Sequence, residues 1–277
     1  MTWTVRRASV RDRDALVTLC RESVGPDDYV IDYLDDLLRQ GVVQVALAGG
    51  ERVVGMMSGQ PCIDGSMWLG QARTHPEVRR QGVARAIIES FARQARASGD
   101  SALRLWTEAG NEEGIRSFTA AGFREVARFT RVIGDPAQGT PRGKPRAFDE
   151  DLWRQVSGSS IAAKGRGYAN HKWYFVAVTR GVTDALAAKG VYRAWDENVL
   201  AVGGNAELQD TFWFTMWAGE AAELFAEARR LAGGSGAQHA GAFIPHDPDL
   251  LAEAHRNGFE PGSWGREAIL AERPVVL

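Results

Sequence analysis

Cysteine is scarce in this chain of 277 residues, which carries only Cys20 and Cys62. The two lie in unrelated stretches, so neither the spacing of a zinc site nor a disulfide framework is indicated, and we expect no metal. No apolar run approaches the roughly 20 residues of a membrane-spanning helix. The N-terminal stretch MTWTVRRASVRDRDAL also lacks the apolar core of a signal peptide. These absences predict a cytoplasmic protein with no membrane partner.

An excess of charge of either sign is lacking too. The chain has 33 Lys and Arg residues against 35 Asp and Glu residues, a formal net charge of −2. Such a chain has no overall positive field to attract nucleic acid, so we expect none as a partner. The length suits two domains of ordinary size, and 44% hydrophobic residues supply a core for each. Composition leaves the oligomeric state open, a homodimer included.

The first half alternates between helical and strand patterns. Apolar residues recur at helical spacing in 9–23, 29–40 and 83–97, and a shorter helix is expected from Asn111 to Gly122. Strands are expected at 5–8, 42–48, 53–58, 67–74, 102–109 and 124–133, with Gly49-Gly50 as a hairpin turn. This order predicts a mixed α/β fold, an α+β-type mixed sheet covered by helices.

The stretch HPEVRRQGVARAII, residues 75–88, places two arginines and a glycine where the third long helix begins. A helix N-terminus has unpaired amides and partial positive charge, and Gly82 would let an anion approach the backbone closely. A pyrophosphate would fit there. The alternative is a loop whose arginines face water, because such short patterns often occur without the function.

The surroundings favour the first interpretation. HPEVRRQGVARAII follows a predicted strand, and LRLWTEAGNEEGIRSFTAAGF lies just downstream. Together they resemble the GCN5-related N-acetyltransferase family, over roughly residues 3–133. The matching positions are Pro76, Arg79, Gly82 and Ala84 in the first motif, and Asn111, Ile115, Gly122 and Phe123 in the second.

The resemblance implies a site for acetyl-CoA as co-substrate. In that family the loop amides hold the pyrophosphate, and the preceding strand pairs with the pantetheine arm. Asn111 would flank the arm from the other side. The implied cofactor-binding residues in the loop are Thr74, Val78, Arg79, Arg80, Gln81, Gly82, Val83 and Ala84.

The sequence departs from the family at the tyrosine that often protonates the departing thiolate, because Phe118 stands at that position. General acid assistance contributes about 10²–10⁴ in rate. Ser117 could orient a water molecule instead, although a helical serine is commonly solvated. Glu108 is the candidate base for the amine, and its alternative is a solvated carboxylate at a strand end.

The segment GPDDYVIDYLDD, between the first two helices, lies where the family shapes its acceptor site. Asp27, Asp28 and Tyr29 are the candidate substrate-binding residues, and their charge favours a cationic amine. The alternative is a helix N-terminus with solvated acids, which the helix dipole favours in any case.

The second half repeats the order of the first. Residues 134–148 are rich in Pro and Gly and predict a linker, so we expect domains at 1–133 and 149–277. The second copy has Glu220 and Glu223 where the first has its arginines and glycine, and these carboxylates would repel a pyrophosphate. The polar stretch 157–172 is a candidate mobile flap.

We therefore interpret the chain as two tandem domains of this family, the second degenerate and without the pyrophosphate loop. The first would move an acetyl group from acetyl-CoA to a primary amine of a small molecule by direct attack, since no Cys-His or Ser-His pair indicates a covalent intermediate. Two alternatives stay open. One is an acetyl-CoA-binding sensor or scaffold with little catalysis, and the other is an acetyltransferase for protein lysines or N-termini.

Overall fold

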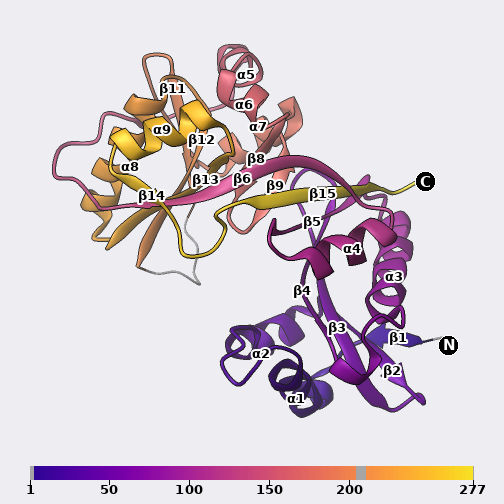
Figure 1. Ribbon diagram of the computed structural model, residues 1–277. Coiled ribbons are helices and arrows are strands. Elements are labelled where there is room, and N and C mark those ends of the chain that lie inside the picture. Colours follow the sequence, from indigo (N-terminus) through magenta and orange to yellow (C-terminus); the bar gives the residue numbers. More distant parts are fainter. Residues whose placement is uncertain (1–2, 204–209, 277) are drawn as a thin grey trace. The chain divides into compact units, whose positions relative to one another are not determined.

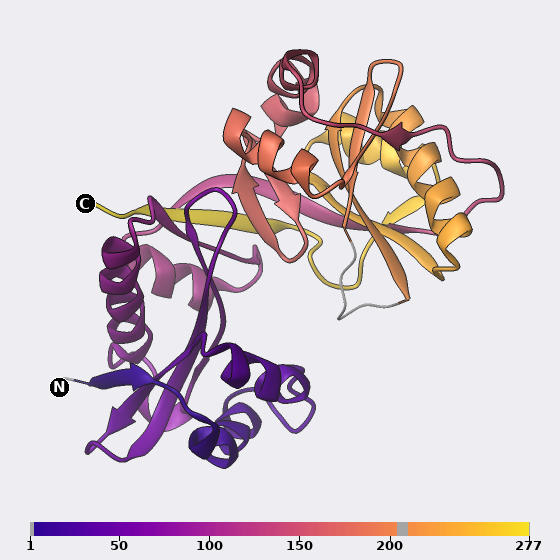
Figure 2. The same ribbon diagram turned by 180° about the vertical axis from the view of Figure 1, so that it is seen from behind.

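The computed structural model describes residues 3–203 and 210–276 (Figures 1 and 2). The chain folds into two compact units, and each is made of segments that are separate in the sequence. The first unit comprises Met1–Leu105, Glu112–Arg124 and Glu272–Leu277, and the second comprises Trp106–Asn111 and Glu125–Ala271.

The first unit is a sheet with helices on both faces. Its strands follow the order β1-β2-β3-β4-β5, in which β1 to β4 are antiparallel neighbours and β4 and β5 are parallel. Helices α1 and α2 lie on one face and α3 on the other (Figure 1). The elements are β1 Thr4–Arg7, α1 Arg13–Ser23, α2 Val30–Gln40, β2 Val43–Ala48, β3 Arg52–Pro61, β4 Met67–Thr74, α3 Val83–Ser98, β5 Ala102–Glu108 and α4 Glu112–Ala120, with short 3₁₀ turns at Val10–Asp12 and Pro76–Val78.

Two glycines in β3 let helix α3 lie close to the sheet. Gly55 and Gly59 are four residues apart, so they lie on the same face of the strand. A Cβ atom at Gly55 would overlap Cγ1 of Val83, and one at Gly59 would overlap the ring of Phe91. The start of α3 is therefore fixed against the sheet by direct backbone-to-side-chain packing.

The second unit contains a further stretch of sheet in the order β15-β6-β13-β12-β11-β10-β7. Its apolar core gathers around Phe214, Phe225 and Phe259. The elements are β6 Arg124–Gly134, β7 Lys144–Pro145, α5 Glu150–Ser157, α6 Ser160–Lys164, β8 Tyr168–His171, β9 Tyr174–Ala177, α7 Arg180–Ala188, β10 Tyr192–Trp195, β11 Asn198–Val202, β12 Thr211–Ala218, α8 Ala221–Ser235, β13 His239–Pro245, α9 Pro248–Arg256, β14 Phe259–Pro261 and β15 Ala268–Pro274.

The predicted boundary at residue 133 does not coincide with these units. The second half of strand β6 pairs with β13, from Gly134 opposite Ala240 to Phe129 opposite Pro245. After a first passage at Trp106–Asn111, the chain therefore enters the second unit again directly after Arg124, and its last residues return to the first. Pairing between strands more than a hundred residues apart leaves no mark in local composition, which is why the Pro- and Gly-rich stretch suggested a different boundary.

Two further expectations are corrected in the second unit. The predicted linker is anchored, because the amides of Arg142 and Gly143 both donate to Oε1 of Glu227 at 2.7 Å. The predicted flap 157–172 instead forms α6 and β8, with Ile161 and Ala169 buried. Within the described ranges, no helix is long and apolar enough to cross a membrane.

Candidate functional site

The beginning of helix α3 has open backbone donors. Gly82 is its N-cap, with φ 84°, and supplies no side chain to cap the helix. No described carbonyl accepts a hydrogen bond from the amides of Gly82, Val83 or Ala84. Gly82 has empty space where a Cβ would stand. An anion can therefore approach the positive end of a 16-residue helix dipole without obstruction.

The loop before Gly82 is held in place by contacts to its neighbours. Nη2 of Arg79 donates to the carbonyl of Ser23 at 2.8 Å, at the end of α1. Gln81 donates from its side chain to the carbonyl of Glu77, and its own carbonyl accepts from Nε1 of Trp3. The guanidinium of Arg79 thus fixes the loop to α1, and its amide donates to the carbonyl of Pro76 at 3.3 Å, so its place in the predicted cradle stays a prediction.

Arg80 is exposed and has a positive φ of 61°. An arginine seldom adopts this conformation, which costs of the order of 1 kcal/mol. Unlike Arg79, it has no hydrogen bond or ion pair among the described residues. Its charge is consequently available beside the free amides.

Strand β4, which leads into this loop, has an open edge. Its parallel pairing with β5 covers only Met67 opposite Leu103 and Trp68 opposite Arg104. Beyond that, β4 carries an irregularity at Gln71, whose φ is 50° and whose Oε1 accepts from the hydroxyl of buried Ser58. Such a distortion turns a strand away from its neighbour. Beyond Trp68, the described part of β5 does not pair with this edge of β4, although the carbonyl of Ala72 accepts from Nη1 of Arg73 at 3.0 Å.

A strand edge that leads to an open helix N-terminus fits a long ligand with an amide-containing arm and a pyrophosphate. Residues 13–123 match the family model of the acetyltransferase (GNAT) family. This part of the chain is a GNAT acetyltransferase domain. GNAT domains use acetyl-CoA, in agreement with the predicted co-substrate.

Solved GNAT structures resemble the whole chain in fold. A protein from Thermoplasma acidophilum that is named an acetyltransferase aligns with a TM-score of 0.65 at 16% identity, covering 98% of this chain and 99% of that one. GCN5-related N-acetyltransferases from Sphaerobacter thermophilus (TM-score 0.58, 13% identity, coverage 99% and 96%) and Kribbella flavida (0.52, 13%, 99% and 71%) also align. No curated protein matches the sequence. The mixed α/β fold predicted from the sequence is confirmed.

Phe118 is buried in α4 of the GNAT domain, with its ring 6.3 Å from that of Phe123 in an edge-on arrangement. An apolar contact therefore occupies the place where the family often has a hydroxyl. Ser117 is exposed on the same helix. Its suggested role in orienting a water molecule stays a prediction.

Glu108 and Asn111 fall in the second unit. One carboxylate oxygen of Glu108 accepts a hydrogen bond from the amide of Gly265, so the side chain is neither fully solvated nor free. Asn111 donates from Nδ2 to Oγ1 of Thr107 at 2.9 Å and is exposed. The assignments of Glu108 as base and Asn111 as cofactor neighbour stay predictions.

The expectation for Asp28 is corrected. Its side chain is fully buried and makes two hydrogen bonds with Arg73, at 2.6 and 2.5 Å. Burial alone would raise the pKa of Asp28, but the Arg73 guanidinium and the amide of Val30 lower it on balance. The carboxylate thus offers no free negative charge, although Asp27 and Tyr29 remain exposed.

Helix α8 of the second unit, which follows β12, begins with different groups from those at the start of α3. The amide of Glu220, the N-cap of α8, donates to Oδ1 of Asn198 at 2.9 Å, and Glu223 pairs with Arg142. A side chain on Gly219 would overlap Asn198. The start of α8 thus carries the carboxylates of Glu220 and Glu223, which would repel an anion.

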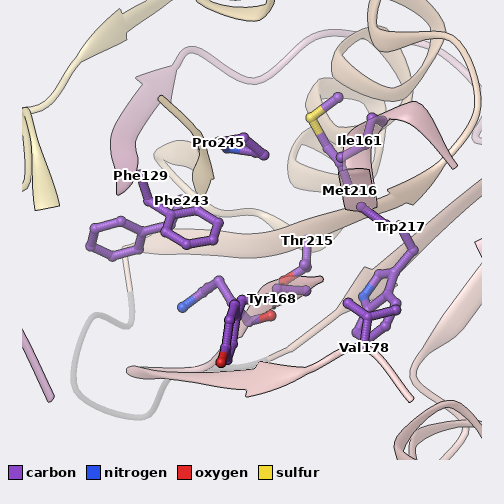
Figure 3. Close-up of a pocket in the computed structure, with 12 residues that line it drawn as sticks. Phe129, Ile161, Tyr168, Val178, Thr215, Met216, Trp217, Phe243 and Pro245 are labelled. Carbon is purple, nitrogen blue, oxygen red and sulfur yellow. Dashed lines mark hydrogen bonds between the residues drawn. The ribbon is translucent and has the colours of Figure 1, made fainter. Parts of the chain in front are cut away.

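The strand opening of the second unit is filled as well. Strand β12 pairs with β13 only from Thr211 to Trp213, and hairpin β8–β9 packs against both strands beyond that point. Oγ1 of Thr215 donates to the carbonyl of Asn170, and the ring of Phe175 lies 4.3 Å from that of Phe129. Figure 3 shows the lining side chains, which leave about 10 Å³, room for one water molecule.

Several of these features have no local sequence signal. Arg73 is 45 residues from Asp28, and the Gln71 irregularity lies inside an ordinary strand pattern.

In the described part of the chain, no group of three or more His, Cys, Asp or Glu side chains could hold a metal ion.

Proposed function

We propose that the GNAT domain transfers an acetyl group from acetyl-CoA to a primary amine of a small molecule, by direct attack of the amine on the thioester. The observation that carries this proposal is the open N-terminus of α3 beside the open edge of β4. The amides of Gly82, Val83 and Ala84 would hold the pyrophosphate, with Arg80 adding positive charge. Peptide groups of β4 up to Thr74 would pair with the pantetheine arm.

The acceptor must lose a proton before it can attack. For an amine with a pKa near 10.4, holding it neutral at pH 7 costs about 4–5 kcal/mol. The nitrogen then forms its bond to the acetyl carbon, the carbon–sulfur bond breaks, and the sulfur leaves with the electron pair. We propose Glu108 as the group that receives the amine proton. Since Phe118 has no hydroxyl, the thiolate leaves with water as its proton source, with Ser117 orienting that water.

We further propose that the second unit is a degenerate copy of the same fold that binds no acyl-CoA. Its elements β10-β11-β12-α8-β13-α9 follow the order of β2-β3-β4-α3-β5-α4. Asn198 accepts from the N-cap amide of α8, Glu220 and Glu223 place negative charge there, and hairpin β8–β9 fills the opening between β12 and β13. The protein would then bind one acetyl-CoA per chain.

A second candidate is a domain that binds acetyl-CoA as a sensor or scaffold. Buried Phe118 in place of a hydroxyl favours it. Release of free thiol from acetyl-CoA in the presence of an amine panel separates the two candidates. The panel should include a lysine peptide and a peptide with a free N-terminus. A faster reaction with either peptide would indicate that the acceptor is a protein and not a small molecule.

The cofactor assignment is tested with Arg80→Glu. Hydrogen bonds to charged groups contribute about 1.5–3 kcal/mol, so we expect acetyl-CoA to bind at least about tenfold more weakly by calorimetry. Arg93→Glu is the matched control, because it makes the same charge change on an exposed face of α3 about 15 Å further along the helix. Equal binding by wild type and Arg80→Glu would remove the pyrophosphate assignment.

A further inference from the structure

The second unit contains a buried arginine that has no acidic partner among the described residues. Arg131 lies on β6 and is only 8% exposed. Its amide donates to the carbonyl of Gly265, and its carbonyl accepts from the amide of Gly262. Its side chain lies over two indole rings, with Cζ 3.8 Å from the centroid of Trp264 and 5.5 Å from that of Trp213. The guanidinium is thus fixed by stacking.

Among the described residues, no acceptor is available to Nε of this guanidinium. Its Nε is buried without a hydrogen-bond partner, and no carboxylate of residues 3–203 or 210–276 lies within ion-pair distance of it. Burial lowers the pKa of Arg131 to about 10, an effect that Asp210 opposes, and the group stays charged at neutral pH. A buried charge without a counter-charge is costly, so its presence needs an explanation.

Arg131 lines an open groove with about 420 Å³ of free space. The groove also has an apolar side, formed by Ile133 and Pro261, and a histidine, His239, whose Nδ1 is buried without a hydrogen-bond partner. Two residues that each have a buried nitrogen without a partner thus line one groove. Its volume lies in the range of small-molecule sites.

We propose that this groove binds a small organic carboxylate, whose charged group pairs with Arg131 while its apolar body packs against Ile133 and Pro261. A stacked arginine presents its donors in a fixed plane, which matches the two oxygens of a carboxylate.

The other charges of the groove favour a monoanion. Asp210 and Glu260 also line it, and Glu260 is paired with Nδ1 of His255 at 2.6 Å. One guanidinium beside two carboxylates suits a ligand with a single negative charge and disfavours dianionic phosphate. The inference does not depend on the proposed function, because it concerns residues of the second unit alone.

The test is a ligand-observed NMR titration of the full chain with benzoate, benzylamine and inorganic phosphate. We expect benzoate to bind with a dissociation constant of about 1 mM or below, equivalent to about −4 kcal/mol. Phosphate should bind at least about tenfold more weakly, and benzylamine not at all. Benzoate should bind Arg131→Gln at least about tenfold more weakly than wild type, since a charged hydrogen bond is lost.

Arg180→Gln is the matched control. Arg180 also belongs to the second unit and lies over an aromatic ring, that of Phe148, but it is exposed and paired with Glu150. The Arg180→Gln variant should bind benzoate with the same affinity as wild type. Arg131→Lys keeps the positive charge but loses the planar pair of donors that can bind both carboxylate oxygens, so it should bind benzoate with intermediate affinity. It is the variant to use if Arg131→Gln fails to fold. No benzoate binding to wild type, unchanged binding in the Arg131 variants, or equal binding of benzylamine would overturn the proposal.

Discussion

The buried pair of Asp28 and Arg73 gives the sharpest prediction on stability. Asp28→Asn keeps the size of the side chain and can still accept the hydrogen bond from the amide of Val30. The change removes the charge and one of the two hydrogen bonds that the carboxylate accepts from Arg73. Arg73, whose side chain is 11% exposed, would then be left without its counter-charge. Breaking a buried pair on one side costs about 3–5 kcal/mol. At about 2–4 °C per kcal/mol for a chain of this size, the melting temperature should fall by roughly 6–20 °C.

The assay is thermal unfolding followed by circular dichroism at neutral pH. Asp35→Asn serves as the control, because the Arg13–Asp35 pair is exposed on both sides and should contribute at most about 1 kcal/mol. The double variant Asp28→Asn with Arg73→Met should recover part of the loss, since it leaves no unpaired charge. A loss below about 1 kcal/mol in Asp28→Asn would refute the reasoning.

The same pair predicts how stability depends on acid. The folded-state pKa of Asp28 lies below its usual value, which is about 3.9 in an unfolded chain. Its contribution is therefore fully present above about pH 4 and is lost as the pH falls through the folded-state pKa. Between about pH 5 and about pH 2, the range around the ordinary aspartate pKa, wild type should lose more stability than Asp28→Asn. Equal losses in the two proteins would contradict the lowered pKa of Asp28.

Three further predictions concern the GNAT domain and its proposed chemistry. Gly55→Ala should push α3 away through Val83, at a cost of about 1–3 kcal/mol, and should weaken acetyl-CoA binding by calorimetry; unchanged stability and affinity would contradict the close packing. Phe118→Tyr should raise kcat by about tenfold or more with acetyl-CoA affinity unchanged, and no gain would mean that the ring does not face the thioester. Glu108→Gln can still accept from the Gly265 amide, so the melting temperature should hold while thiol release falls by about 10²-fold or more; full turnover would exclude Glu108 as the base.

Local patterns were sufficient to predict the elements of the proposed cofactor site. Gly82 and the apolar repeat of Val83, Ile87 and Phe91 fix where α3 begins and which face it buries, and the structure starts the helix at Val83. Strand β4 has the predicted bounds, Met67–Thr74. Both patterns depend on residues that are close together in the chain, so they can be recognised in a single sequence.

Non-local features could not be predicted in the same way. Asp28 has the local signature of a helix N-terminus, and only the fold brings Arg73 to it. Arg131 lies in an ordinary strand pattern, and its stacking on Trp264 depends on a turn that is far away in the sequence. The polar composition of residues 157–172 predicted a mobile flap. The opening between β12 and β13, against which part of this stretch packs, is formed only by the fold.

The central claim is that free amides at the start of α3 bind the pyrophosphate of acetyl-CoA. Amide NMR of the labelled protein, titrated with coenzyme A, tests it most directly. The account predicts that the signals of Gly82, Val83 and Ala84 shift strongly and saturate, while that of Glu220, whose amide is bonded to Asn198, stays in place. Unmoved signals at Gly82 to Ala84, or a larger shift at Glu220, would contradict it.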